Sequence, residues 1–157
     1  MPTIALFVDV QNIYYTTRDT WKRPFNYRKF WDTVSAQGDI RVANAYAIDR
    51  GDEGQRRFQD ALRHIGFTVR LKPYIQRADG SAKGDWDVGI TIDVLEAASR
   101  VDRVILLSGD GDFDLLLDKI RLDHGVSTEV YGVPGLTAHS LIQSADTFHP
   151  ITETLLQ

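Results

Sequence analysis

The sequence indicates an α/β protein, a three-layer α/β/α sandwich with a mostly parallel central sheet. Short apolar runs alternate with segments whose apolar residues recur at i, i+3, i+4 and i+7, which is the pattern of βαβ units. The run at 104–107 is apolar on both faces, as in a strand that helices cover on both sides. We expect a single domain over residues 1–157, with its core at about 3–150 and a short polar tail.

The elements follow in chain order. Residues 3–9 form a buried strand that ends on Asp9, and a short turn or helix follows it. Further strands are expected at 40–48, 67–71, 102–108 and 127–133, with a last short extended piece at 148–151. Apolar stripes predict helices at 27–34, 58–65, 85–100 and 112–124, and a shorter one near Thr137. Residues 74–83 form a polar loop, and the helix at 85–100 is apolar around most of its circumference, which predicts that it is largely buried.

The composition narrows the class of protein. Its 43% hydrophobic and 25% charged residues are ordinary for a globular protein, and no apolar run approaches the roughly 18 residues that cross a bilayer. With no cysteine, a disulfide framework and a thiolate metal site are excluded. No targeting segment precedes the first strand, so we expect a cytoplasmic protein without a membrane partner. The net charge of −4 argues against coating nucleic acid by bulk electrostatics, but not against an enzyme with an acidic metal site.

Carboxylates gather where two buried strands end. Asp9 closes the first strand, and Asp110 and Asp112 follow the strand at 102–108 on the turn into the next helix. If the strand order reverses between these strands, their ends meet at the edge where open α/β sheets bind ligands. Carboxylates brought that close repel one another unless a cation neutralises them, and hard oxygen ligands select Mg²⁺ or Mn²⁺. Such an ion can activate water and stabilise charge on a phosphoryl group.

Each acid also has an ordinary structural interpretation. Asp9 can simply cap the helix that follows it, Asp112 can cap its own helix, and Asp87 can complement a helix dipole. Asp93 lies six residues after Asp87, roughly 120° around the helix, and joins the same site only if the cleft wraps that helix. Asp114 lies inside the helix, and we expect it to be solvated or to support the site indirectly.

Several other side chains are candidates for contact with a substrate. Asn12 can donate to a phosphate oxygen or orient the carboxylate before it, and it can equally be an ordinary turn residue. Lys83 can meet a phosphate or remain solvated. Tyr14, Tyr15 and Trp86 can stack on unpaired bases, although a core position is commoner for aromatic residues and is preferred for Trp86.

Three short motifs occur in order along the chain. They are Asp9-x-x-Asn12 after the first strand, Lys83-Gly84-x-x-Asp87 at the start of a helix, and the run Ser108-Gly109-Asp110-Gly111-Asp112-Phe113. Together they resemble the NYN domain, a PIN-like nuclease group, and most of all its LabA-like branch. The resemblance covers essentially the whole chain. It implies a PIN-like, Rossmannoid α/β/α sandwich that cleaves RNA phosphodiester bonds with a divalent metal ion, Mg²⁺ or Mn²⁺.

The resemblance also implies roles for particular residues. Acidic catalytic and metal-binding roles fall on Asp9, Asp87, Asp110 and Asp112. Asp93 matches a recurrent acidic position and is a further metal candidate, while Asp85 is an alternative to Asp87. We expect substrate contacts from Asn12, Lys83 and Ser108. Candidates for holding the phosphate backbone are Arg18, Lys22, Arg23, Arg77 and Lys83.

Two other functions stay open at this point. A metal-dependent phosphatase acting on small phosphoesters would use the same acids, and a non-catalytic NYN module would bind RNA or regulate without cleaving. The expected partner is single-stranded RNA, and because no stretch is strongly basic, its capture is expected to need a partner protein or a homodimer. An EF-hand is excluded because its sixth and twelfth positions are Leu115 and Arg121. P-loop, dinucleotide-binding and nucleophile-elbow motifs are absent.

Overall fold

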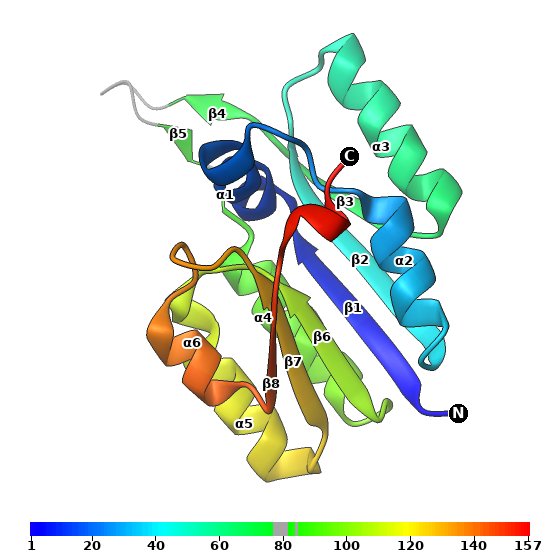
Figure 1. Ribbon diagram of the computed structural model, residues 1–157, viewed down its shortest axis with the longest axis vertical. Coiled ribbons are helices and arrows are strands. Elements are labelled where there is room, and N and C mark those ends of the chain that lie inside the picture. Colours follow the sequence, from blue (N-terminus) through cyan, green and yellow to red (C-terminus); the bar gives the residue numbers. More distant parts are fainter. Residues whose placement is uncertain (77–81, 84) are drawn as a thin grey trace.

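A computed structural model describes residues 1–76, 82–83 and 85–157, and its central sheet has six strands that all run parallel (Figure 1). The strand order is β3-β2-β1-β6-β7-β8. The strands are β1 (Thr3–Asp9), β2 (Asp39–Asp49), β3 (Thr68–Pro73), β6 (Arg103–Leu107), β7 (Ser127–Gly132) and β8 (Thr147–Pro150). The predicted α/β/α sandwich is therefore confirmed, and its sheet is entirely rather than mostly parallel.

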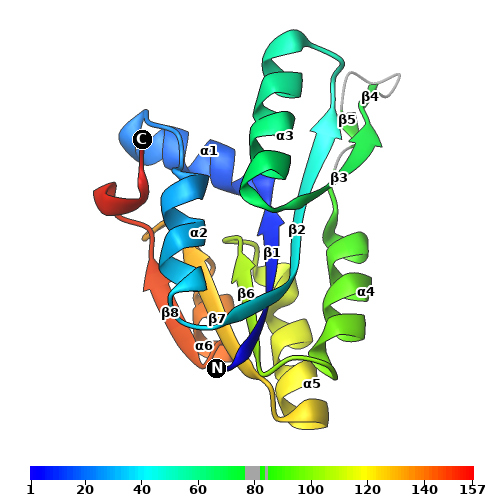
Figure 2. The same ribbon diagram turned by 90° about the vertical axis from the view of Figure 1, so that its right-hand side faces the viewer.

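Helices cover both faces of this sheet (Figure 2). One face carries α1 (Val10–Trp21), α2 (Tyr27–Ser35) and α3 (Glu53–Ile65). The other carries α4 (Asp87–Ala98), α5 (Asp114–His124) and α6 (His139–Ser144). Successive side chains of β1 point to opposite faces of the sheet, so both faces need a covering layer. Ile4, Leu6 and Val8 belong to the core on the first face, and Ala5 and Phe7 belong to the core on the second.

The strand order reverses between β1 and β6, which is the condition for the acids at their ends to meet. From β1 the chain builds outward through β2 to β3, and then returns through α4 to place β6 on the other side of β1. In the parallel register, Val8 pairs with Leu107. The residues that follow this pair therefore emerge side by side at the C-terminal edge, which is the position of ligand sites in open α/β sheets.

The structure corrects the prediction that α4 is largely buried. Ile90 and Val94 are buried against the sheet, but Val88 and Ile92 are mostly exposed. The helix belongs to an outer layer, so only one side of it contacts the sheet and α5. An apolar composition on every side of a helix gives no period from which the buried side can be identified.

The polar loop predicted at 74–83 also differs from the structure. It contains two short strands that pair antiparallel, β4 (Ile75–Gln76) and β5 (Ala82–Lys83). Arg77, a predicted phosphate contact, lies outside the described residues. Among the helices in the described part of the chain, none has both the length and the apolar composition that a membrane crossing requires.

The last residues are mostly polar and exposed, but Leu156 among them is packed against the core. Short η2 (Glu153–Leu155) leads into Leu156, which is 5% exposed and pairs with Phe25 in an antiparallel bridge. Main-chain hydrogen bonds join this segment to the connection between α1 and α2, from Asn26 N to Leu155 O and from Gln157 N to Pro24 O. The core therefore extends past residue 150.

This packing predicts a stability effect at the end of the chain. Replacing Leu156 by alanine is expected to lower the free energy of unfolding by about 2 kcal/mol, the low end for buried leucine because a chain end relaxes easily. Leu122→Ala is the matched control, since Leu122 is 85% exposed, and its effect is expected to stay within about 0.5 kcal/mol. Urea denaturation of both variants measures the difference, and equal effects would contradict the packing described here.

Candidate metal centre

The candidate site is built on the ends of β1 and β6. Asp9 is the last residue of β1, and Ser108, Gly109 and Asp110 follow β6. The main-chain N–H of Ser108 still bonds to Tyr131 O of β7, so the turn starts only after it. Asp110 then accepts a hydrogen bond from Asp112 N (2.9 Å) and caps the 3-10 turn η1 (Gly111–Phe113), after which α5 begins.

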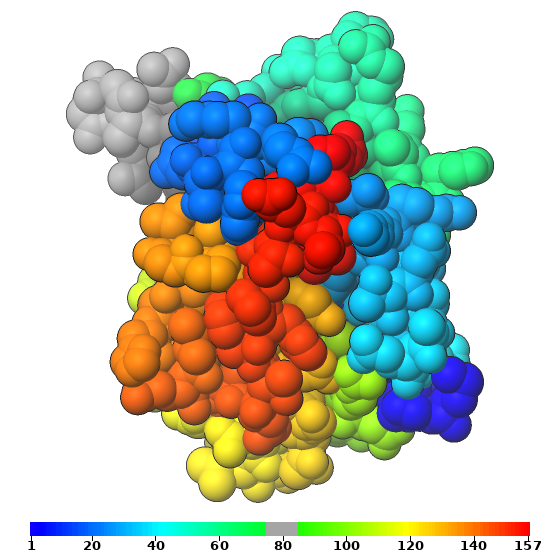
Figure 3. Space-filling model, in the orientation of Figure 1, coloured from blue at the N-terminus to red at the C-terminus, as the bar shows by residue number. Residues whose placement is uncertain are grey.

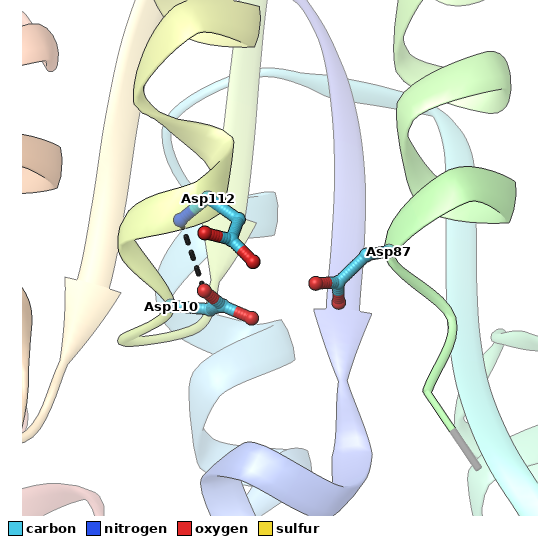
Figure 4. A group of neighbouring side chains, drawn as sticks. All are labelled: Asp87, Asp110 and Asp112. Atoms are coloured by element: carbon cyan, nitrogen blue, oxygen red, sulfur yellow. Dashed lines mark hydrogen bonds between the residues drawn. The ribbon is translucent and has the colours of Figure 1, made fainter. Parts of the chain in front are cut away.

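Three carboxylates converge at this edge (Figure 4). Asp87 is the first residue of α4, and Asp110 and Asp112 come from the turn after β6. One oxygen of each lies within 4.8 Å of the other two. This acidic triad offers only oxygen donors, which suit Mg²⁺ or Mn²⁺ better than softer metals. The donor set therefore fits the divalent ion that the sequence predicts.

The pKa values of two acids are raised, mainly by burial and further by the neighbouring carboxylates. Burial raises the pKa of Asp87 to about 7, helped by the close approach of Asp110 and by the charges of Asp85 and Asp9. Burial also raises the pKa of Asp9 to about 6, although hydrogen bonds from Ser108 and Asn12 act in the opposite direction. In the absence of a cation, part of this cluster is thus protonated near neutral pH.

Two polar side chains join the ends of β1 and β6. The Ser108 hydroxyl donates to Asp9 Oδ2 (3.1 Å) and accepts from Asp110 N (3.1 Å). Asn12 Oδ1 accepts from Gly109 N (2.8 Å), and Asn12 N donates to Asp9 Oδ1 (3.4 Å). Ser108 has no exposed surface, so it positions carboxylates and is not placed for the substrate contact that was expected of it. Asn12 is partly exposed, and like Ser108 it connects the end of β1 to the turn after β6.

Close packing explains the first glycine of the acidic run. A Cβ atom on Gly109 would lie 2.5 Å from the main-chain oxygen of Leu136, in the connection between β7 and α6. Ala138 N donates to Gly109 O (2.9 Å) and fixes that connection against the turn. The segment around Leu136 thus supports the site, and the sequence contained no signal for it because its contribution is made through main-chain atoms.

The structure distinguishes the two acids at the start of α4. Asp85 is exposed, and its Oδ1 accepts from Asp87 N (3.2 Å), so it fixes the main chain where the helix begins. Asp87, and not Asp85, contributes to the acidic triad. Lys83 belongs to β5, and its side chain lies outside the described part of the chain, so its phosphate contact stays a prediction.

Asp93 and Asp114 lie outside the acidic triad. Asp93 accepts from Tyr46 Oη (2.8 Å) and forms an ion pair with Arg70 Nη1 (2.7 Å), so it already has partners on β2 and β3. Asp93 is therefore not brought together with Asp87 in one site. Asp114 accepts from Leu115 N (2.6 Å) at the start of α5. Neither Tyr46 nor Arg70 was identified from sequence as a partner of Asp93.

The three candidate aromatic residues differ in their exposure to solvent. Trp86 is buried, and its Nε1 donates to Ala47 O (2.9 Å), which makes it a core residue as preferred from sequence. Tyr14 and Tyr15 are exposed on α1, a helix of 12 residues where the sequence predicted only a short turn or helix. Asp9 caps this helix and also lies beside the acidic residues, so the two interpretations of Asp9 do not exclude each other.

Comparison with known proteins agrees with this geometry. The profile of the NYN domain family matches residues 3–152, a range that includes all three sequence motifs. The low amplitude and bright protein LabA of Synechococcus elongatus is 29% identical over 154 residues, which cover 92% of this chain and 81% of LabA. A crystal structure of a protein of unknown function from Vibrio parahaemolyticus is 52% identical, with a TM-score of 0.94, and the match covers 99% of this chain and 96% of that one. The predicted resemblance is confirmed, and the chain belongs to the NYN domain family.

Proposed function

We propose that this protein is a Mg²⁺- or Mn²⁺-dependent ribonuclease that hydrolyses RNA phosphodiester bonds at the C-terminal edge of its sheet. The observation that carries the proposal is the convergence of Asp87, Asp110 and Asp112, with Asp9 near enough for its charge to act on Asp87. Like charges held together and partly buried are costly unless they bind a cation. Membership in a family related to PIN-like nucleases supports the same reaction class.

The side chains have distinct parts in this proposal. Asp87, Asp110 and Asp112 would hold the ion, and Asp9 would add negative charge from the end of β1. A divalent ion bound there supplies Lewis acidity toward a phosphoryl oxygen and lowers the pKa of water. Ser108 and Asn12 keep the carboxylates in place through the hydrogen bonds described above. Because Asp9 and Asp87 have raised pKa values, ion binding must displace protons from them near neutral pH.

The first prediction concerns cleavage. Purified protein is expected to cut labelled single-stranded RNA with Mg²⁺ or Mn²⁺ and to lose this activity with a chelator. Asp110→Asn is expected to lower the rate by at least about 100-fold, because it removes a ligand charge while keeping the side-chain shape. Asp114→Asn is the matched control, since Asp114 lies outside the acidic triad, and it should retain wild-type activity.

Three outcomes would contradict the ribonuclease proposal. One is equal cleavage by wild type and Asp110→Asn, which would point to a contaminating enzyme. Another is turnover of a nucleoside monophosphate without cleavage of an oligomer, which would indicate a metal-dependent phosphatase. The third is RNA binding that a chelator leaves unchanged, without cleavage under either metal, which would indicate a non-catalytic module.

The second prediction concerns stability as a function of pH. The folded pKa values of Asp9 (about 6) and Asp87 (about 7) exceed the ordinary value of 3.8. At pH values between the ordinary and the raised pKa, the folded state therefore binds more protons than the unfolded state. The stability that these groups contribute is complete below about pH 4 and is lost as the pH rises to about 7 in metal-free protein. A divalent ion replaces those protons, so its stabilising effect should grow over the same range.

Thermal unfolding measures this effect. Mn²⁺ is expected to raise the Tm by about 3 °C or more near pH 7.5 and by much less near pH 5.5. Asp110→Asn should lose the metal effect and, without metal, unfold at a higher temperature than wild type near pH 7.5, because one repelling charge is gone. Asp114→Asn should behave as wild type. Equal metal effects at both pH values would contradict the protonation argument.

A further inference from the structure

A groove of about 830 Å³ adjoins Asp9 through α1 and lies on the face of the sheet opposite α4 and α5. Its walls are α1, the connection to α2, the end of β2 and the start of α3. Figure 3 shows α1 (blue), the C-terminal residues (red) and α3 (teal) meeting on one face of the molecule. The volume is typical of pockets that hold ligands, which span about 300–1,000 Å³. None of the acidic triad residues lines this groove.

The groove is positively charged although the whole chain carries a net charge of −4. Its lining contains four cationic side chains and one carboxylate side chain, that of Asp52, which accepts from Gln55 N (2.7 Å) as the cap of α3. In the described part of the chain, none of the four forms an ion pair with a carboxylate side chain; they are Arg18, Lys22, Arg23 and Arg50. Arg23 instead donates from its Nε to the oxygen of Gln157 (2.8 Å), another lining residue. Cationic side chains gathered in this way on an acidic protein attract a polyanion.

Exposed aromatic rings lie beside these cations. Tyr14 and Tyr15 are 51% and 40% exposed, and their ring centroids are 5.3 Å apart. The Arg18 guanidinium lies 5.2 and 5.1 Å from the two centroids, which holds its charge next to both rings. Phe58 exposes its ring on the α3 wall, and Arg50 lies 4.7 Å from the ring of Tyr74. Sites for single-stranded nucleic acid combine the same two features, rings for bases and cations for phosphates.

The groove begins next to Asp9, at the acidic edge. Asp9 caps α1, the helix that forms one wall, and the next residue, Val10, already lines the groove. Burial raises the pKa of Tyr27, another lining residue, and the negative charge of Asp9 raises it further, so the two lie near each other. From Asp9 to Arg18 is nine residues, or about 13 Å along a helix. One strand can therefore contact both places only if it is several nucleotides long.

We infer that this groove binds the stretch of single-stranded RNA that flanks the phosphodiester at the acidic edge. Tyr14 and Tyr15 stack on unpaired bases, and Arg18 and Arg50 hold backbone phosphates from opposite walls. The inference rests on the proposed function for the identity of the strand, but binding in the groove does not itself require cleavage. Ring faces and phosphate contacts read little sequence, so the groove is expected to have weak sequence preference.

The test measures binding separately from cleavage. The parent protein is Asp110→Asn with Mg²⁺, and fluorescence anisotropy follows a labelled single-stranded RNA of about 12 nucleotides. Adding Arg18→Gln and Arg50→Gln is expected to raise the Kd about tenfold and to reduce the slope of log affinity against log salt by about 1 to 2. The control, Arg28→Gln with Lys29→Gln, removes the same charge from exposed positions on α2 and should leave both quantities unchanged.

Stacking has its own pair of variants in the same parent. Tyr14→Ala with Tyr15→Ala is expected to raise the Kd at least about fivefold, whereas Tyr14→Phe with Tyr15→Phe keeps the ring faces and should retain affinity. Equal losses in the alanine and phenylalanine pairs would overturn the stacking role. Equal binding by the arginine pair and its α2 control would overturn the groove assignment.

The outcomes separate this inference from the proposed ribonuclease activity. Cleavage by the wild type together with unchanged binding in all groove variants would leave the activity standing and overturn the groove. Groove-dependent binding without cleavage under any metal would overturn the activity and support the groove. An acidic peptide that binds the parent as tightly as RNA, with the same losses in the arginine pair, would assign the groove to a protein partner and overturn the RNA inference.

Discussion

Partly buried hydrogen bonds between the ends of β1 and β6 hold the acidic edge in place. The Ser108 hydroxyl links Asp9 to the main chain of Asp110, and Asn12 links the start of α1 to Gly109. These residues are about a hundred positions apart in sequence and meet only because β1 and β6 are neighbours where the strand order reverses. The caps of α1 and η1 and the convergence with Asp87 all depend on that adjacency.

Capping a helix start is compatible with the metal binding proposed for the same acids. Asp9 accepts from Asn12 N as a helix cap, and its carboxylate still contributes to the field that raises the pKa of Asp87. Asp110 accepts from Asp112 N, and an oxygen of each belongs to the acidic triad. The N–H groups at helix starts offset part of the repulsion among these carboxylates, since they present positive charge to them. The folded protein therefore holds a cluster of carboxylates whose negative charge is only partly offset.

The charges are segregated on the two sides of α1. Acids collect between β1, β6 and α4, and cationic side chains collect in the groove between α1 and α3. The net charge of the chain conceals this division, because the two regions largely cancel in the sum. A polyanionic strand would be attracted by the groove and repelled by the acidic edge until a cation binds there. In this proposal, metal binding and substrate binding favour each other.

Local patterns predicted most of the fold and the position of the acids. Apolar runs and helical stripes identified the strands and the main helices, and Asp110 and Asp112 were identifiable because they directly follow an apolar strand. The same patterns were wrong about α4, because periodicity could not indicate which of its apolar sides is exposed, and they did not indicate that Leu156 is buried. Burial of Leu156 depends on Phe25, which is far away in sequence, so no local signal could predict it.

The sequence therefore determined which residue types stand at strand ends and helix starts, since those depend on neighbours along the chain. Tertiary structure decided which of them meet. It placed Asp87 rather than Asp85 in the acidic triad and paired Asp93 with Arg70 and Tyr46 on separate strands. It also formed a basic groove from residues as distant as Val10 and Gln157. Contacts of this kind depend on the strand order and on how the helices pack, which are set by the whole core rather than by any one segment.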